Sequence, residues 1–181
     1  MNLTKEWFRE HGACSPGYNW VLHRKNEDAL ETMQALLSIS RIDWADWVLA
    51  RLLEKEDQVR VTLFILEEIL PTFIKRNPNA EHGLLFDSQD HIKKFLDPEE
   101  NTRENRFISR TMAMDLTCDH FRGDPDDLYD FMVYALGVTY ADTIDLRHSC
   151  TSYLMDKAFS MGGKEFHRKM FEYSIKLADL D

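Results

Sequence analysis

The chain has 181 residues, a length that favours one compact domain or two small domains joined together. Hydrophobic residues make up 44% and charged residues 30%, which excludes a disordered chain, a collagen and a disulfide-rich miniprotein. Lysine and arginine number 22 against 32 aspartates and glutamates, so the net charge is -10. A negatively charged protein repels phosphates, and direct binding of DNA or RNA is therefore not expected.

The sequence carries no sign of export or membrane insertion. Its N terminus lacks the apolar core of a signal peptide, and no apolar run approaches the roughly 20 residues of a membrane span. The cysteines, Cys14, Cys118 and Cys150, lie far apart and form no CxxC pair. We therefore expect a cytoplasmic protein with reduced thiols, in which the cysteines serve as small buried hydrophobic side chains.

The first half of the chain reads as a series of helices. Gly12 suits the end of the first helix, and Ser15, Asn26 and Asp43 are expected to cap the next three. Apolar residues recur at helical spacing after each cap. The expected helices cover residues 3–11, 15–22, 26–37, 43–52 and 56–76. Pro71 is expected to kink the last of these or to end it one residue earlier.

The second half continues in the same way after a loop at residues 77–79. Ser88 is expected to cap a short helix, and Asp97 followed by proline begins a longer one. Further helices start near 125 and 144, with Gly137 as a point where the first can be interrupted, and the glycines at 162–163 separate a final helix. The side chains of the helix after Asp97 that we expect to face the core are Phe107, Met114, Leu116 and Phe121.

These elements predict an all-α protein, a compact bundle of about eight to ten helices. We expect one helical domain over residues 1–181, which can be subdivided into a tryptophan-rich half, 1–79, and an aspartate-rich half, 80–181. Seven glycines and five prolines supply too few turns for a sandwich of many short strands.

Familiar catalytic and metal-binding motifs are missing from the sequence. GxGxxG, GxxxxGK[ST], GxSxG and HExxH do not occur. The best zinc candidate combines Cys118, Asp119, His120, His148 and Cys150. Residues two apart on a helix point about 200° apart, so Cys118 and His120 cannot face one ion together. The aspartates at 124–130 lack the glycine that a calcium loop needs at its sixth position, where this chain has Tyr129. We expect no catalytic residue, cofactor or metal.

Two other groups have both a structural and a functional interpretation. Glu67 and Glu68 adjoin on an apolar helix, and burial of one would raise its pKa and make it a candidate general acid, although the polar edge of the helix is the simpler place for both. Trp44 and Trp47 share a helix face, and Arg51 lies one turn beyond Trp47, where it can stack on that ring. Such a stripe forms a core or an interface anchor.

Negative charge is concentrated in one part of the chain. Residues 111–156 contain nine aspartates against two arginines, Arg122 and Arg147. Several of these aspartates are three or four residues apart, so that each pair projects on one side of its helix. The simple interpretation is a solvated face, and the functional one is a surface that docks on a basic protein. The residues predicted to bind this partner are Asp115, Asp119, Asp126, Asp127, Asp130, Asp142 and Asp145.

Residues Leu3 to Asn79 also carry a resemblance. The segment Ala-Cys-Ser-Pro-Gly-Tyr-Asn-Trp at 13–20, followed by Asp-Trp-Ala-Asp-Trp at 43–47 and by Ile-Leu-Pro at 69–71, resembles a set of small bacterial and phage proteins, several of them described as immunity proteins. The alanine-rich second half of that set is absent from this chain. The resemblance implies an inhibitory binding role, and a phage origin would equally suit an anti-CRISPR or other anti-defence protein.

Charge and resemblance together predict a non-enzymatic, acidic, stoichiometric inhibitor. Its expected partner is a basic protein that handles nucleic acid, such as a nuclease or a CRISPR effector, and it would occupy the groove that phosphates otherwise use. The alternatives are a hydrolytic or metal-assisted enzyme with a carboxylate and a histidine, and a phage structural subunit. The sequence leaves the oligomeric state open, including a homo-oligomer.

Overall fold

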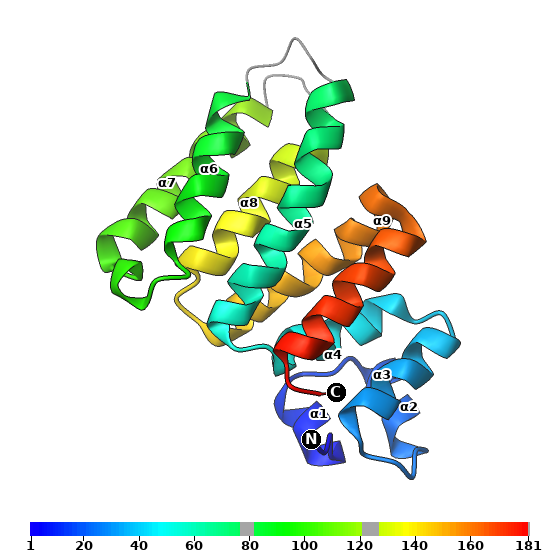
Figure 1. Ribbon diagram of the computed structural model, residues 1–181. Helices are drawn as coiled ribbons and strands as arrows, with labels where there is room; N and C mark the ends of the chain where they lie inside the picture. The colour runs from blue at the N-terminus through cyan, green and yellow to red at the C-terminus, as the bar shows by residue number, and fades with distance from the viewer. Residues whose placement is uncertain (77–81, 121–126, 181) are drawn as a thin grey trace.

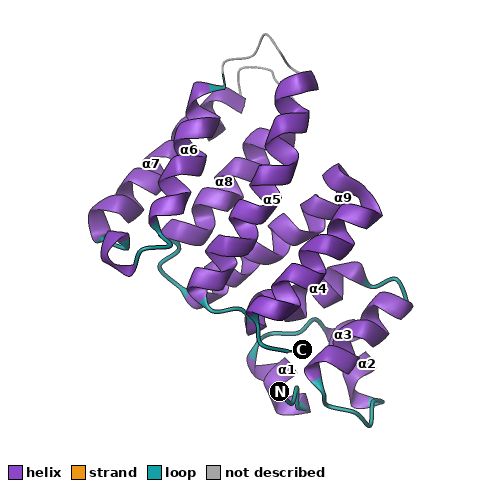
Figure 2. Ribbon diagram, viewed as in Figure 1, coloured by secondary structure: helices purple, strands orange, loops and turns teal. Residues whose placement is uncertain are grey.

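The computed structural model describes residues 1–76, 82–120 and 127–180, with all side chains in these ranges except those at 76, 117–120 and 127–129. The described ranges contain nine α-helices, one short 3-10 helix and no strand, which confirms the predicted all-α bundle (Figure 2). The helices are α1 (Lys5–Glu10), α2 (Ser15–Leu22), α3 (Ala29–Ser38), α4 (Ile42–Leu52), α5 (Lys55–Arg76), α6 (Gly83–Lys94), η1 (Pro98–Glu100), α7 (Arg103–His120), α8 (Asp127–Tyr140) and α9 (Ile144–Leu177).

The helices form two groups that meet along α9. Helices α5 to α8 run alternately up and down, while the short helices α1 to α4 gather at one end of the molecule (Figure 1). Helix α9 packs on α4, α5 and α8, and it turns back on itself at Gly163, whose φ is 77°. This confirms the predicted break at the glycine pair. The positive φ suits glycine because a Cβ atom would strain the backbone there.

Three predicted helix caps lie one to two residues from the observed ones. Cys14 takes the cap position of α2, which leaves Ser15 in the first turn. Asp28 caps α3 in place of Asn26, since its carboxylate accepts a hydrogen bond of 3.0 Å from the backbone N–H of Glu31. Asp43 lies inside the first turn of α4 rather than at its cap. At α2 and α4 the observed cap residue makes no side-chain hydrogen bond to the first turn, so a capping side chain does not fix where these two helices begin.

Two predicted helix ends and one predicted cap are not found. Helix α5 continues through Pro71 to Arg76 instead of ending one residue before the proline, and α8 continues through Gly137. Ser88 lies buried within α6, where its hydroxyl donates to the carbonyl oxygen of Leu84 at 2.7 Å, and it therefore does not begin the helix. Tertiary packing keeps these helices continuous despite their local sequence.

The buried face of α7 differs from the predicted one. Phe107 is 68% exposed and Met114 is 62% exposed, whereas Leu116 is buried as expected. Phe121 lies outside the described residues. Helix α7 packs on α8, and the hydroxyl of Thr139 donates to that of Ser109 at 2.9 Å. The buried face of α7 carries Ser109, Ala113 and Leu116 at helical spacing, which turns Phe107 and Met114 outward.

Candidate functional site

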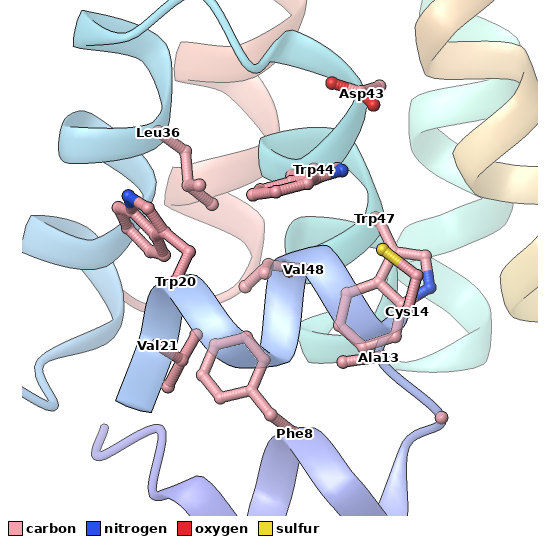
Figure 3. A pocket seen from close by; sticks show the side chains of 12 residues that line it. Phe8, Ala13, Cys14, Trp20, Val21, Leu36, Asp43, Trp44, Trp47 and Val48 are labelled. Atoms are coloured by element: carbon pink, nitrogen blue, oxygen red, sulfur yellow. The ribbon is translucent and has the colours of Figure 1, made fainter. Parts of the chain in front are cut away.

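An open pocket lies where α1 to α4 meet, and four of its lining side chains are aromatic: Phe8, Trp20, Trp44 and Trp47 (Figure 3). We call it the aromatic pocket. Its volume is about 240 Å³. Seven of its twelve lining residues belong to the segments 13–20 and 43–47, which are far apart in sequence and carry the resemblance to immunity proteins. The fold thus brings both motifs to one site.

Glycines shape the entrance of this pocket. Gly12 ends α1 with a φ of 73°, and the chain turns there into α2. A Cβ atom on Gly17 would lie 3.3 Å from the sulfur of Cys14 and 3.8 Å from the Trp44 ring. The missing side chain therefore lets α2 approach α4 closely and keeps the space between them open.

An arginine covers each of the three tryptophans in the aromatic pocket. The guanidinium carbons of Arg24, Arg41 and Arg51 lie 4.7, 3.3 and 3.9 Å from the ring centroids of Trp20, Trp44 and Trp47. The contact between Trp47 and the arginine one turn later confirms the predicted stacking, which is a cation–π interaction. Burial lowers the pKa of Arg51 to about 10.

The aromatic pocket offers little for acid–base chemistry. Its carboxylate, Asp43, is engaged by Arg41 through two hydrogen bonds of 3.0 and 2.8 Å. The remaining ionisable group in the lining is the thiol of Cys14, a free and exposed cysteine. With mostly apolar walls, the site suits an aromatic or aliphatic group, and it does not contain a nucleophile with an adjacent base.

The buried acid of the motif, Asp46, points away from the pocket toward α9. Its side chain is fully buried, and Nε2 of His167 donates to its carboxylate oxygens at 2.9 and 3.0 Å. Burial raises the pKa of Asp46 to about 6, against the hydrogen bond from His167, which lowers it. Phe159 and Phe171 lie against the imidazole. The pair is closed to substrates, and it joins α4 to α9.

The predicted partner-binding aspartates whose side chains the structure describes fall into two groups. Asp115 on α7 is exposed and Asp130 on α8 is half-buried, while the side chains of Asp119, Asp126 and Asp127 lie outside the described ones. Because α7 and α8 run antiparallel, Asp115 and Asp130 belong to the end of the pair where α7 ends and α8 begins. We call this the acidic end.

The last two predicted aspartates, Asp142 and Asp145, follow α8. Helix α8 ends at Tyr140, ten residues beyond Asp130, which corresponds to about 15 Å of helix. Both aspartates are exposed, but Asp142 lines a groove with three arginines and Asp145 lies near Arg51. The structure therefore separates them from the acidic end and places them among positive charges.

That groove, which we call the arginine groove, has a volume of about 620 Å³. Its lining residues are Arg103, Arg106, Phe107, Arg110, Tyr140, Asp142, Thr143 and Leu146. The prediction from sequence missed it because the acidic stretch was counted from residue 111, directly after the last of these arginines. Their spacing of three and four residues, which places them on one side of a helix, is the signal that could have found them.

The candidate catalytic and metal residues whose side chains the structure describes are not assembled into a site. Glu67 and Glu68 are both exposed, so the burial that would make one of them a general acid is absent. Burial lowers the pKa of His148 to about 4 and raises that of Cys150 to about 11. Within the described ranges no three potential metal-binding side chains lie together, and the side chains at 118–120 fall outside those ranges.

Comparison with protein-family models, with curated proteins and with solved structures finds no match for this chain. The resemblance of residues 3–79 to immunity proteins consequently stays a prediction. Among the described helices, none combines the length and the apolar character needed to cross a bilayer.

Proposed function

We propose that the protein acts by binding rather than by catalysis, as a stoichiometric inhibitor of a basic effector that handles nucleic acid, of the toxin-immunity or anti-CRISPR kind. The observation that carries this proposal is the acidic end. Asp115 and Asp130 have no ion-pair partner among the described residues, and they belong to a chain with a net charge of -10. Unpaired carboxylates at one end of two packed helices suit a basic surface.

The proposed contact is narrower than the sequence indicated. It consists of Asp115 and Asp130 together with Asp119, Asp126 and Asp127, which are close to them along the chain. Asp142 and Asp145 contribute less, because the positive charges beside them offset their own. The inhibitor would cover phosphate-binding groups on its partner, and complementary charge would speed the encounter.

Capture followed by inhibition tests the proposal. The immobilised protein is exposed to bacterial lysate, bound proteins are identified by mass spectrometry, and each purified candidate is assayed for nucleic-acid cleavage or binding with increasing inhibitor. We expect activity to fall to a plateau at equimolar protein, and the affinity to fall about tenfold or more between about 50 and 200 mM salt.

Matched variants locate the contact. Asp115→Asn with Asp130→Asn should weaken binding about tenfold at low salt, while Asp142→Asn with Asp145→Asn, which removes two exposed charges away from the acidic end, should change it less than about twofold. Binding that ignores both salt and the acidic-end variants contradicts the electrostatic mechanism. Captured proteins whose activity is unaffected at equimolar inhibitor contradict the inhibitory function itself.

A further inference from the structure

The arginine groove does not depend on the proposed inhibitory function, and it has a chemistry of its own. The first half of α7 forms one wall, while Tyr140 at the end of α8 and residues 142–146 at the start of α9 form the other. Its volume of about 620 Å³ lies in the range of small-molecule sites.

The three arginines of the groove are available to a ligand. Arg103 and Arg110 are exposed and Arg106 is half-buried, and none of them has an ion-pair partner in the part of the chain that the structure describes. A guanidinium carries a permanent charge and a planar fork of donors that matches phosphate oxygens. Unpaired arginines that share one concave site therefore favour an oxyanion.

Positive charge extends behind the groove. Lys55 on α5 donates from Nζ to the side-chain oxygen of Asn101 at 2.9 Å. Burial, together with the charges of Arg147 and Arg106, lowers the pKa of Lys55 to about 8. Among the described residues that line the groove, the one acid is Asp142. Negative charge on a ligand would relieve this repulsion among like charges.

An exposed aromatic ring lies among the arginines. Phe107 is one residue from Arg106 and three from Arg110, lines the groove, and leaves 68% of its surface in water. Leu146 on the opposite wall is 48% exposed. A phenyl ring beside guanidinium groups offers a stacking surface for a planar base next to a phosphate site.

Charge along α7 limits the size of this ligand. Asp115 follows Arg110 by five residues, which corresponds to about 7.5 Å of helix, and its carboxylate is exposed. A long polyanion lying along α7 would leave the arginines and meet the acidic end, in a protein whose net charge is already -10. A compact anion confined to the groove avoids that repulsion.

We propose that the arginine groove binds a nucleoside phosphate, with the phosphate held by Arg103, Arg106 and Arg110 and the base stacked on Phe107. Isothermal titration calorimetry of the full chain tests this with ATP, ADP and AMP, alongside pyrophosphate, a short single-stranded oligonucleotide and hexaglutamate. We expect ATP to bind with a Kd below about 100 μM and to bind more tightly than pyrophosphate, because the base adds its own contact.

Variants at exposed positions separate the two halves of the site. Arg103→Ala with Arg110→Ala should weaken ATP about tenfold or more. Arg60→Ala with Arg168→Ala removes the same charge from outside the groove and should have little effect. Phe107→Ala should weaken ATP several-fold and leave pyrophosphate unchanged. Thermal melting checks that all variants fold.

Several outcomes would overturn the proposal. These are no ATP binding up to about 1 mM, equal losses in the two double-arginine variants, or unchanged ATP affinity in Phe107→Ala. Tighter binding of the oligonucleotide or of hexaglutamate would assign the groove to a polymer or an acidic peptide instead. A failure of the inhibition assay described above leaves these titrations unaffected, so the two proposals can fail separately.

Discussion

The aromatic pocket and the arginine groove each involve three arginines, but the two sites use them in opposite ways. At the pocket, Arg24, Arg41 and Arg51 lie over tryptophan rings, and Arg41 also pairs with an acid. At the groove, the arginines have no ion-pair partner among the described residues, and an exposed phenylalanine lines the groove with them. An arginine stacked on an aromatic ring contributes to the structure around a pocket, whereas an arginine with free N–H donors can bind a ligand.

The two sites also differ in how they are encoded. The pocket gathers residues from two motifs that are conspicuous in sequence and about thirty residues apart. The groove gathers three arginines that directly precede the acidic stretch and one aspartate counted within it. The net charge of a sequence segment therefore says little about the charge of the surface that the segment forms. Helices that pack antiparallel bring residues from separate segments together at one end.

The largest effect is expected at the polar pair beneath the pocket. His167→Ala leaves the buried carboxylate of Asp46 without its donor, and the free energy of unfolding should fall by about 3 kcal/mol. Urea denaturation measures it. The control is His23→Ala, which removes an exposed histidine and should cost less than about 0.5 kcal/mol. Equal losses in the two variants would show that the pair does not hold α4 on α9.

A second test concerns the helix packing that supports the groove. A Cβ atom at Gly137 on α8 would lie 2.7 Å from the sulfur of Cys150 on α9, so Gly137→Ala should destabilise the protein by about 2 kcal/mol. Cys150→Ala in the same chain removes the clashing atom and should recover part of that loss. A double-mutant cycle by urea denaturation measures the coupling, and strict additivity would contradict the close approach of the two helices.

The pH dependence of stability should contain two opposing contributions. The pKa of Asp46 is raised to about 6, so the folded state holds its proton longer than the unfolded chain, and this contribution to stability declines as pH rises from about 4 to 6. The pKa of His148 is lowered to about 4, so the unfolded chain binds the proton first, and this contribution declines as pH falls from about 6.5 to 4.

Single variants separate these two contributions to the pH dependence of the free energy of unfolding. In Asp46→Asn, the free energy of unfolding should rise with pH between about 4.5 and 6.5. In His148→Gln, it should fall over the same range. Each change should be about 1 kcal/mol relative to the unmodified chain. Urea midpoints across this range provide the measurement. Slopes of the same sign in both variants would show that one of the two groups is not perturbed by burial.

The prediction with the smallest expected effect on stability concerns the reactivity of the cysteine thiols, and it tests whether the aromatic pocket is open. Cys14 is exposed at the pocket and Cys150 is buried, with its pKa raised to about 11 by that burial. Iodoacetamide should modify Cys14 at least about tenfold faster than Cys150 in the folded protein, and mass mapping of peptides follows both sites. The reference is the protein in urea, where the two cysteines should be modified at equal rates. Comparable modification rates in the folded protein would mean that α8 and α9 separate readily and expose Cys150.

The sequence determined most of the secondary structure, because apolar spacing and local terminators act within a few residues. It indicated the end of α1 at Gly12, the break of α9 at its glycine pair, and the stacking of Arg51 on Trp47. Tertiary structure decided which faces are buried. Phe107 is exposed because the face of α7 that carries Ser109 and Leu116 is the buried one, and Ser109 meets Thr139 of α8, a contact that no local pattern specifies.

The distribution of charge was likewise determined partly by the sequence and partly by the tertiary structure. The sequence determined how many aspartates the segment 111–156 contains, but only the packing of α7 on α8 separated the acidic end from Asp142 and brought Arg103, Arg106 and Arg110 beside it. The buried pair of Asp46 and His167, 121 residues apart in the chain, likewise has no local signal. Composition and helical period are properties of the chain, whereas the neighbours of a charge depend on which helices pack together.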